Sequence, residues 1–158
     1  MNIYDYQRLV GKINDIKELR DQFIVVFDLC DKQMLAKFGM LYKNHILELT
    51  GFVMNETIQK AFDAVNEWID GKTSYHKARN ITFKELYQEV KESKDEIQKR
   101  YLKTIAQLTC IPHVKAHALW ATDMAITLIN QMFPNNLEKV KKERMYQIDI
   151  LKRLIDIN

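Results

Sequence analysis

The sequence predicts an all-α fold, a single bundle of five to seven helices around a central buried helix at about residues 112–132. Three observations support this prediction. Four glycines and two prolines are few for 158 residues, whereas residues that favour helices are plentiful. Apolar residues recur every three or four positions through most of the chain, and helix-capping residues separate these periodic segments. We expect one helical domain over residues 1–158, because this length suits a single core.

The first thirty residues show the weakest periodicity, and we expect them to form an N-terminal extension of the bundle. Residues 5–9 and 15–23 resemble short helical pieces that are separated near Gly11. The β-rich run at residues 23–27 has no partner strand elsewhere in the sequence. We therefore expect this run to pack within or beside a helix.

Two well-delimited helices are predicted next. Asp31 is a suitable N-cap for a helix that ends at Gly51, with His45 in the middle of its apolar stripe. Asn55 begins the following helix, which ends at Gly71. The first stripe comprises Met34, Phe38, Leu41 and Leu49, and the second comprises Ile58, Ala61, Phe62, Val65 and Ile69.

A helix over residues 74–92 follows, and Arg79 lies inside its apolar arc together with Tyr75, Ala78, Phe83, Leu86 and Val90. The segment from Ser93 to Glu96 matches the S-x-x-E capping box and predicts the start of another helix. That helix carries apolar residues three or four positions apart, at Ile97, Tyr101, Ile105 and Leu108.

The central helix is predicted between Pro112, which suits a first helical turn, and Pro134. It is apolar on nearly every side, as is typical of a buried helix. Asn136 caps the last helix, and Arg144 lies on the apolar face of that helix. The other residues of this face are Leu137, Val140, Ile148, Leu151 and Ile155.

Charge and composition argue against several classes of protein. The formal net charge of +3 is small and the lysines are dispersed, so we expect no nucleic-acid partner. No apolar run approaches the length that spans a bilayer, and the charged start of the chain does not resemble a secretory signal. Cys30 and Cys110 lie far apart, and we expect both to be reduced and partly buried. These features favour a soluble cytoplasmic protein with no membrane partner.

Six polar residues stand on or at the edge of apolar helix faces and form the candidate site. A buried guanidinium requires a partner, and Asp123 is the candidate carboxylate for Arg144 or Arg79. One interpretation is structural, with arginines that tie helices together or reach solvent. The other is a polar pocket that binds a ligand or a partner's side chain. The candidate residues are His45, Arg79, His113, His117, Asp123 and Arg144.

His113 and His117 are spaced i, i+4 and can bind one metal ion from a single helix face. A third ligand is needed, and His45, His76 or Asp123 are the candidates. The H-E-x-x-H motif is absent from the sequence. The common alternative is a histidine pair that caps the helix or forms hydrogen bonds in the core.

Nucleophilic catalysis and phosphate binding find little support in the sequence. No G-x-S-x-G motif and no glycine-rich phosphate loop occur. Cys110 lies three residues before His113, a spacing that can lower a thiol pKa at a helix start. A buried, inert cysteine is the commoner state.

The order of several motifs resembles the immunity protein family of bacterial toxin–immunity systems, from about residue 32 to residue 151. The motif at residues 112–126, PHVKAHALWATDMAI, is the most specific. Trp120 and Met124 within it depart from the family pattern. The other matching residues are Phe38 followed by His45-Ile46-Leu47-Glu48, Ala61, Phe62, Trp68, Ile69, Gly71, Lys72, the pair Ala78-Arg79, and Glu143-Arg144-x-x-Gln147.

This resemblance implies an all-helical, non-enzymatic protein that neutralises a cognate toxin by direct binding, without a cofactor. The alternative from the residues is a small helical metal-binding protein or metal-dependent enzyme that holds a divalent metal such as zinc at His113 and His117. A third hypothesis is a homo-oligomer or scaffold in which the polar cluster only fixes the register of the helices. The resemblance supplies no catalytic residues.

Overall fold

The computed structural model describes residues 13–157, and within this range it contains helices and no strand, so the prediction of an all-α fold is confirmed. Residues 5–9, predicted to form a short helical piece, lie outside the described range. The elements are α2 (Lys17–Asp28), α3 (Lys32–Thr50), α4 (Glu56–Ile69), α5 (His76–Ile81), the π-helical turn η1 (Thr82–Leu86), α6 (Tyr87–Glu92), α7 (Glu96–Thr109), α8 (Ala116–Met132) and α9 (Leu137–Ile157).

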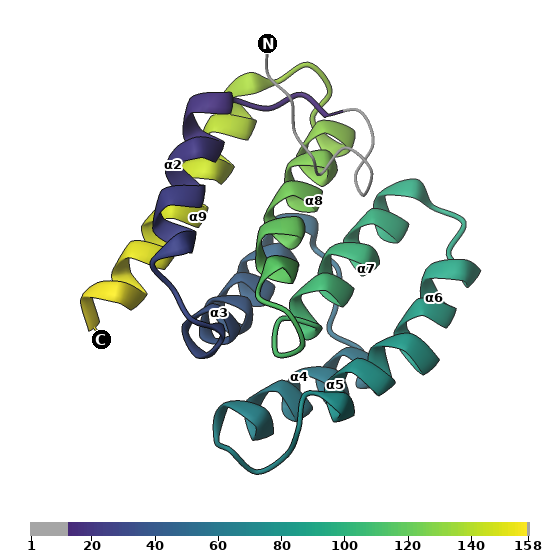
Figure 1. Ribbon diagram of the computed structural model, residues 1–158. Helices are drawn as coiled ribbons and strands as arrows, with labels where there is room; N and C mark the ends of the chain where they lie inside the picture. The colour runs from purple at the N-terminus through teal and green to yellow at the C-terminus, as the bar shows by residue number, and fades with distance from the viewer. Residues whose placement is uncertain (1–12, 158) are drawn as a thin grey trace.

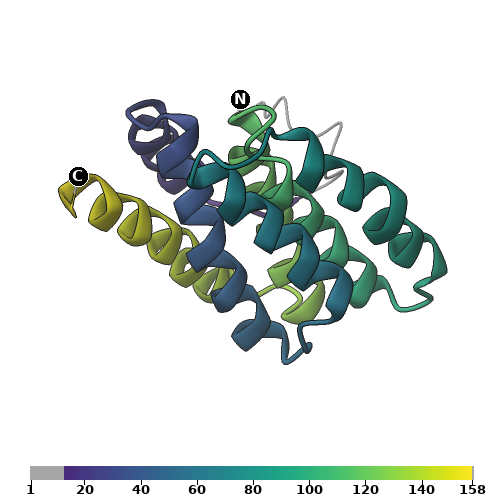
Figure 2. The same ribbon diagram turned by 90° about the horizontal axis from the view of Figure 1, so that it is seen from below.

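Helix α8 is the centre of the bundle, as predicted. It packs most extensively on α7 and also contacts α3 and α9, and residues 121–129 are all buried. Figure 1 shows α8 between the pair α2 and α9 on one side and α7 on the other, with α6 beyond α7. Seen from below, α3 runs beside α9, and α4 lies next to α3 (Figure 2). No helix within residues 13–157 is long and apolar enough to cross a membrane.

Side-chain caps fix the starts of several helices. The Asp31 carboxylate accepts a hydrogen bond from the Met34 amide at 2.8 Å, and Gly51 ends α3 with a φ of 73°, which glycine adopts without strain. The Asn55 side chain caps α4 through the Ile58 amide at 2.8 Å. These predicted helix ends are confirmed.

The predictions for the starts of α7 and α8 were wrong in detail. Asp95, rather than Ser93, caps α7, because its carboxylate accepts from the Gln98 amide at 3.2 Å. Pro112 lies in a turn that precedes α8, and the helix begins at Ala116 without a side-chain cap. The turn leaves Val114 exposed.

The buried face of α3 is rotated from the predicted stripe. Leu41 is 47% exposed, whereas the neighbouring Tyr42 is fully buried, because α3 packs against both α7 and α9. His45 therefore lies at the edge of the buried face. Phe83 and Leu137 are also exposed, contrary to the predicted faces. The buried residues of α3 are Leu35, Ala36, Phe38, Gly39, Tyr42, Lys43 and Ile46.

The segment of residues 13–30 contributes to the core. The β-rich run at residues 23–27 is part of α2, as expected, and α2 packs along α9. Phe23 is fully buried and its ring lies 6.1 Å from the Phe38 ring, centroid to centroid. Two hydrogen bonds between Asn14 and Asn130 join the chain just before α2 to α8.

Candidate functional site

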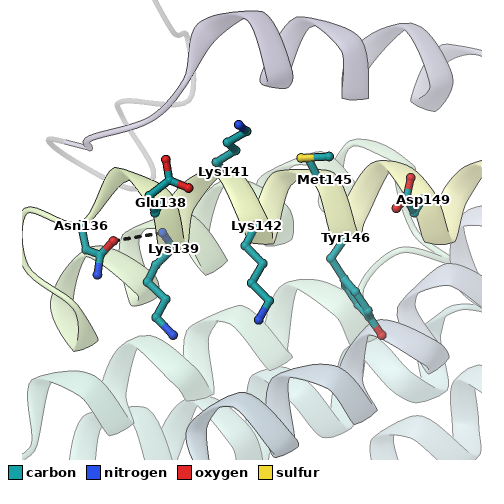
Figure 3. A pocket seen from close by; sticks show the side chains of 8 residues that line it. All are labelled: Asn136, Glu138, Lys139, Lys141, Lys142, Met145, Tyr146 and Asp149. Carbon is teal, nitrogen blue, oxygen red and sulfur yellow. Dashed lines mark hydrogen bonds between the residues drawn. The ribbon is translucent and has the colours of Figure 1, made fainter.

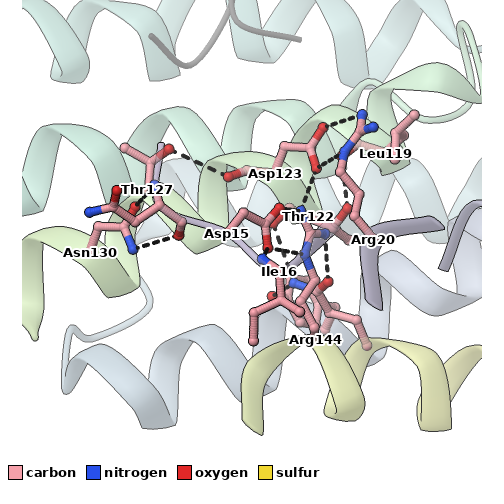
Figure 4. A network of polar contacts seen from close by, with 12 residues as sticks. Asp15, Ile16, Arg20, Leu119, Thr122, Asp123, Thr127, Asn130 and Arg144 are labelled. Atoms are coloured by element: carbon pink, nitrogen blue, oxygen red, sulfur yellow. Dashed lines mark hydrogen bonds and ion pairs between the residues drawn. The ribbon is translucent and has the colours of Figure 1, made fainter. Parts of the chain in front are cut away.

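A buried ion network joins α2, α8, α9 and the segment before α2 (Figure 4). The Arg144 guanidinium donates to both oxygens of Asp15, at 3.1 and 2.5 Å, and to Oδ1 of Asp123 at 2.8 Å. Arg20 donates from Nε and Nη2 to the two oxygens of Asp123, both at 3.0 Å. The side chains of Asp15, Asp123 and Arg144 are almost completely buried. Two positive and two negative groups thus neutralise each other in the core.

The network continues through neutral groups into α3. Arg144 donates from Nη1 to Oε1 of Gln147 at 3.0 Å. The amide of Gln147 donates to the Tyr42 hydroxyl at 2.8 Å, and this hydroxyl donates to Glu143 at 2.5 Å. Glu143 also accepts from Nε2 of His45 at 2.8 Å. The four helices α2, α3, α8 and α9 are therefore connected by one chain of polar contacts.

The electrostatics of this network follow from its burial. Burial opposes the charge of Arg144, but the hydrogen bond to Asp15 and the charge of Asp123 outweigh it and raise the arginine pKa. Burial, together with the charge of Glu143, raises the Tyr42 pKa well above its ordinary value. Both groups keep their protons throughout the physiological pH range. Arg144 and Tyr42 therefore act as fixed hydrogen-bond donors that link neighbouring helices.

The network reaches the surface at His45. The imidazole ring of His45 stacks on the Tyr146 ring with centroids 3.8 Å apart, and Tyr146 is 37% exposed. A groove of about 590 Å³ is lined by residues of α9 and by the Asn136 cap. Figure 3 shows that Lys139, Lys142 and Tyr146 point to one side of α9, whereas Lys141 and Met145 point to the other.

The remaining candidate residues form a second group near the start of α8. The rings of His113 and His117 lie 5.9 Å apart, and Nδ1 of His117 donates to Oε1 of Gln107 at 2.7 Å. The Arg79 guanidinium lies 4.8 Å from the centre of the Phe83 ring. Burial, the neighbouring His113 and the charge of Arg79 lower the His117 pKa to about 4, so this imidazole is neutral at pH 7.

Within residues 13–157, no group of three His, Cys, Asp or Glu side chains lies close enough to hold a metal ion. His113 and His117 therefore have no third ligand among these side chains. The candidates for this role are engaged elsewhere: His45 with Glu143, and Asp123 with Arg20 and Arg144. His76 stacks on Tyr75 with ring centroids 4.1 Å apart. Zinc at His113 and His117 stays a prediction that metal analysis would test.

Cys110 does not have the properties of an activated thiol. Burial raises its pKa to about 11, although hydrogen bonds with Thr109 and Thr82 oppose the shift. A thiol with such a pKa is protonated at neutral pH and is a poor nucleophile. Cys30 is also buried, and its pKa is likewise raised by burial.

The structure thus divides the six predicted residues into two groups. Asp123, Arg144 and His45 share the ion network, and the expected pairing of Asp123 with Arg144 is confirmed. The alternative pairing of Asp123 with Arg79 was wrong, because Asp123 binds Arg20 and Arg144 instead. Arg79, His113 and His117 belong to the second group. Sequence reasoning did not identify the other members of the network: Asp15, Arg20, Tyr42, Glu143 and Gln147.

Only some of these missed residues could have been recognised from the sequence. Glu143 and Gln147 flank Arg144 within the E-R-x-x-Q motif of the last helix, so a shared hydrogen-bond network was foreseeable. Asp15 and Arg20 precede the segment that resembles a family. Their 129- and 103-residue separations from Arg144 and Asp123 leave no pattern that local periodicity can reveal.

Comparison with known proteins supplies the family. No significant match to this chain was found among the curated proteins or among the solved structures. A family model described as "Imm-5 like putative immunity protein" matches residues 26–154. That range contains α3 to α8 in full and most of α9, including Tyr42, Asp123 and Arg144. The chain therefore belongs to the Imm-5-like immunity protein family.

Proposed function

We propose that this protein neutralises a toxin by binding it directly and stoichiometrically, without a catalytic step. The observation that carries the proposal is the match of residues 26–154 to an immunity protein family. An immunity protein protects its host from a toxin, and direct binding is the simplest mechanism that requires no reactive group.

The geometry of the polar residues supports binding over catalysis. Arg20 and Arg144 pair with Asp15 and Asp123 in the core. The Cys110 thiol has a pKa of about 11. The network also fixes four helices relative to each other. A rigid scaffold loses little conformational entropy on binding, which favours affinity.

The test uses the toxin encoded by a gene next to that of this protein. Co-expression should restore growth of cells that produce the toxin, and the two purified proteins should elute as one complex in size-exclusion chromatography. Titration of toxin activity distinguishes the mechanisms. We expect inhibition to be complete at about one molecule of this protein for each toxin molecule, as tight binding requires.

Two outcomes would contradict the proposal. Failure of the wild-type protein to protect cells or to bind the toxin would remove the proposed function. Full inactivation of the toxin by a small fraction of an equivalent would instead indicate an enzyme, since each molecule would then act more than once.

A further inference from the structure

A groove between the helix of residues 76–92 and α7 carries positive charge that its own lining does not balance. The groove measures about 610 Å³ and is lined by Phe83, Tyr87, Val90, Lys91, Lys99 and Lys103. Three of these six side chains are lysines, three are apolar or aromatic, and none is acidic. The α9 groove differs, because Glu138 and Asp149 lie among its lysines.

The acidic residues near this groove, which we call the basic groove, do little to compensate the lysines. Glu96 lies 3.9 Å from Lys99, and its side chain is 76% exposed, so water screens the pair. On the other wall, Glu89 accepts a hydrogen bond from Asn55 and Glu92 accepts one from Gln88, so these contacts do not pair either carboxylate with a lysine of the groove.

The cations on α7 also lie close enough to repel each other. Lys99 and Lys103 lie four residues apart on one helix face. Burial lowers the Lys103 pKa and the charges of Arg100 and Lys99 lower it further, although the charge of Glu96 opposes part of this shift. Like charges held together in this way are unfavourable for the isolated protein. A ligand that brings negative charge would relieve the repulsion.

The aromatic part of the basic groove distinguishes between classes of anionic ligand. Phe83 is 50% exposed, but its ring stacks on Tyr87 with centroids 5.4 Å apart, and the Arg79 guanidinium lies 4.8 Å from its centre. The Phe83 ring thus already makes one stacking contact and one cation–π contact within the protein. A nucleobase would need a free ring face, whereas the positively polarised ring edge suits a carboxylate or an apolar side chain.

The π-helical turn η1 places these aromatic residues. The hydroxyl of Thr82 donates to the Ala78 carbonyl at 2.9 Å and forms a 2.6 Å hydrogen bond with the Thr109 hydroxyl. The Tyr87 amide donates to the Thr82 carbonyl, five residues earlier. The wider turn is therefore anchored to α7 by a buried contact, and such turns are frequent at functional sites.

We infer that the basic groove binds an acidic segment of a protein partner, in which carboxylates face Lys91, Lys99 and Lys103 and an apolar side chain contacts Phe83. This inference rests on the proposed function in taking the toxin as that partner. Complementary charge across such a contact would speed association and would make it sensitive to salt.

The experiment compares two triple variants of the full chain that lower the net charge equally. The groove variant carries Lys91→Glu, Lys99→Glu and Lys103→Glu. The control variant carries Lys139→Glu, Lys141→Glu and Lys142→Glu, all on α9. The first probe is a fluorescein-labelled peptide of alternating glutamate and leucine, followed by fluorescence anisotropy. The second probe is the toxin encoded by the adjacent gene.

For the peptide, we expect the groove variant to bind at least about tenfold more weakly than wild type, and the control variant to stay within about twofold. Phe83→Ala should weaken binding severalfold while its circular dichroism spectrum at the assay temperature stays that of the folded protein. Met145→Ala on α9 should leave binding unchanged. Equal losses in the two triple variants, or no preference of the wild-type protein for this peptide over a lysine–leucine peptide, would overturn the inference. Tighter binding of single-stranded oligothymidine than of the acidic peptide would overturn it as well.

The toxin probe separates this inference from the proposed function. If the wild-type protein and the groove variant neutralise the toxin equally well, the inference fails while the proposed function stands. A different result is that the wild-type protein fails to neutralise the toxin while the groove variant, and not the control variant, loses binding to the acidic peptide. In that case the proposed function fails and the specificity of the groove is supported. Loss of protection in the groove variant alone supports both.

Discussion

Asp123 is the residue on which the core electrostatics depend most. It accepts hydrogen bonds from both Arg20 and Arg144 and is fully buried. Asp123→Asn should therefore lower the free energy of unfolding by about 3–5 kcal/mol, because it leaves two buried guanidiniums with one carboxylate between them. For a chain of this length the melting temperature should fall by about 10 °C. Urea unfolding checks this, with Asp149→Asn on the exposed side of α9 as the control. A loss equal to that of the control would contradict the role of Asp123.

His117 should make stability depend on pH on the acidic side. Its folded-state pKa is about 4, below the ordinary value of 6.5, so the unfolded chain binds the proton more tightly. The stabilising contribution is complete above pH 6.5 and is lost as the pH falls from 6.5 through 4. We expect a loss of about 1–2 kcal/mol after allowance for partial exposure. Urea unfolding between pH 4 and 7 should show this loss in wild type and in the exposed control His76→Gln, but not in His117→Gln. If the free energy of unfolding of His117→Gln falls with pH as steeply as that of wild type, the pH dependence does not come from His117.

At the scale of the helix, the start of α7 tests which residue caps it. The Asp95 carboxylate accepts the Gln98 amide hydrogen bond, whereas the Ser93 hydroxyl only donates to the Asp95 carbonyl and the Gln98 side chain. Asp95→Ala should reduce the free energy of unfolding by about 1 kcal/mol. Ser93→Ala should change it by less than about 0.5 kcal/mol. The opposite order in urea unfolding would restore the capping box predicted from the sequence.

The helices themselves were predictable from local signals, but their orientation was not. Asp31, Gly51 and Asn55 mark helix ends through contacts within four residues, and such contacts leave a pattern in the sequence. The side of α3 that is buried depends instead on where α7 and α9 pack. Apolar spacing alone therefore assigned Leu41 to the core and His45 to the middle of the buried stripe.

For the whole molecule, the candidate site was only half predictable. Periodicity marks a charged residue on an apolar face, and this identified Asp123 and Arg144. It does not reveal which distant residue completes the pair. Asp15 and Arg20 come from a segment with weak periodicity, and the family match begins only at residue 26. The fold nevertheless brings both residues into the ion network.

The network implies that Asp15 and Arg20, which precede the family match, contribute to the stability of this protein. In the full chain, Asp15→Asn combined with Arg20→Gln preserves net charge. Among residues 13–157 it leaves Arg144 and Asp123 with only each other as ion-pair partners. This double variant should lose about 2–4 kcal/mol of unfolding free energy. The matched control is Lys17→Gln with Asp21→Asn, which removes a salt bridge of the same helix whose side chains are about half exposed. Exposed pairs contribute little, so the control should lose less than about 1 kcal/mol. If urea unfolding shows equal losses in the two double variants, the buried ion pairs of Asp15 and Arg20 stabilise the protein no more than an exposed pair does. The segment before the family match would then not be required for the stability of the bundle.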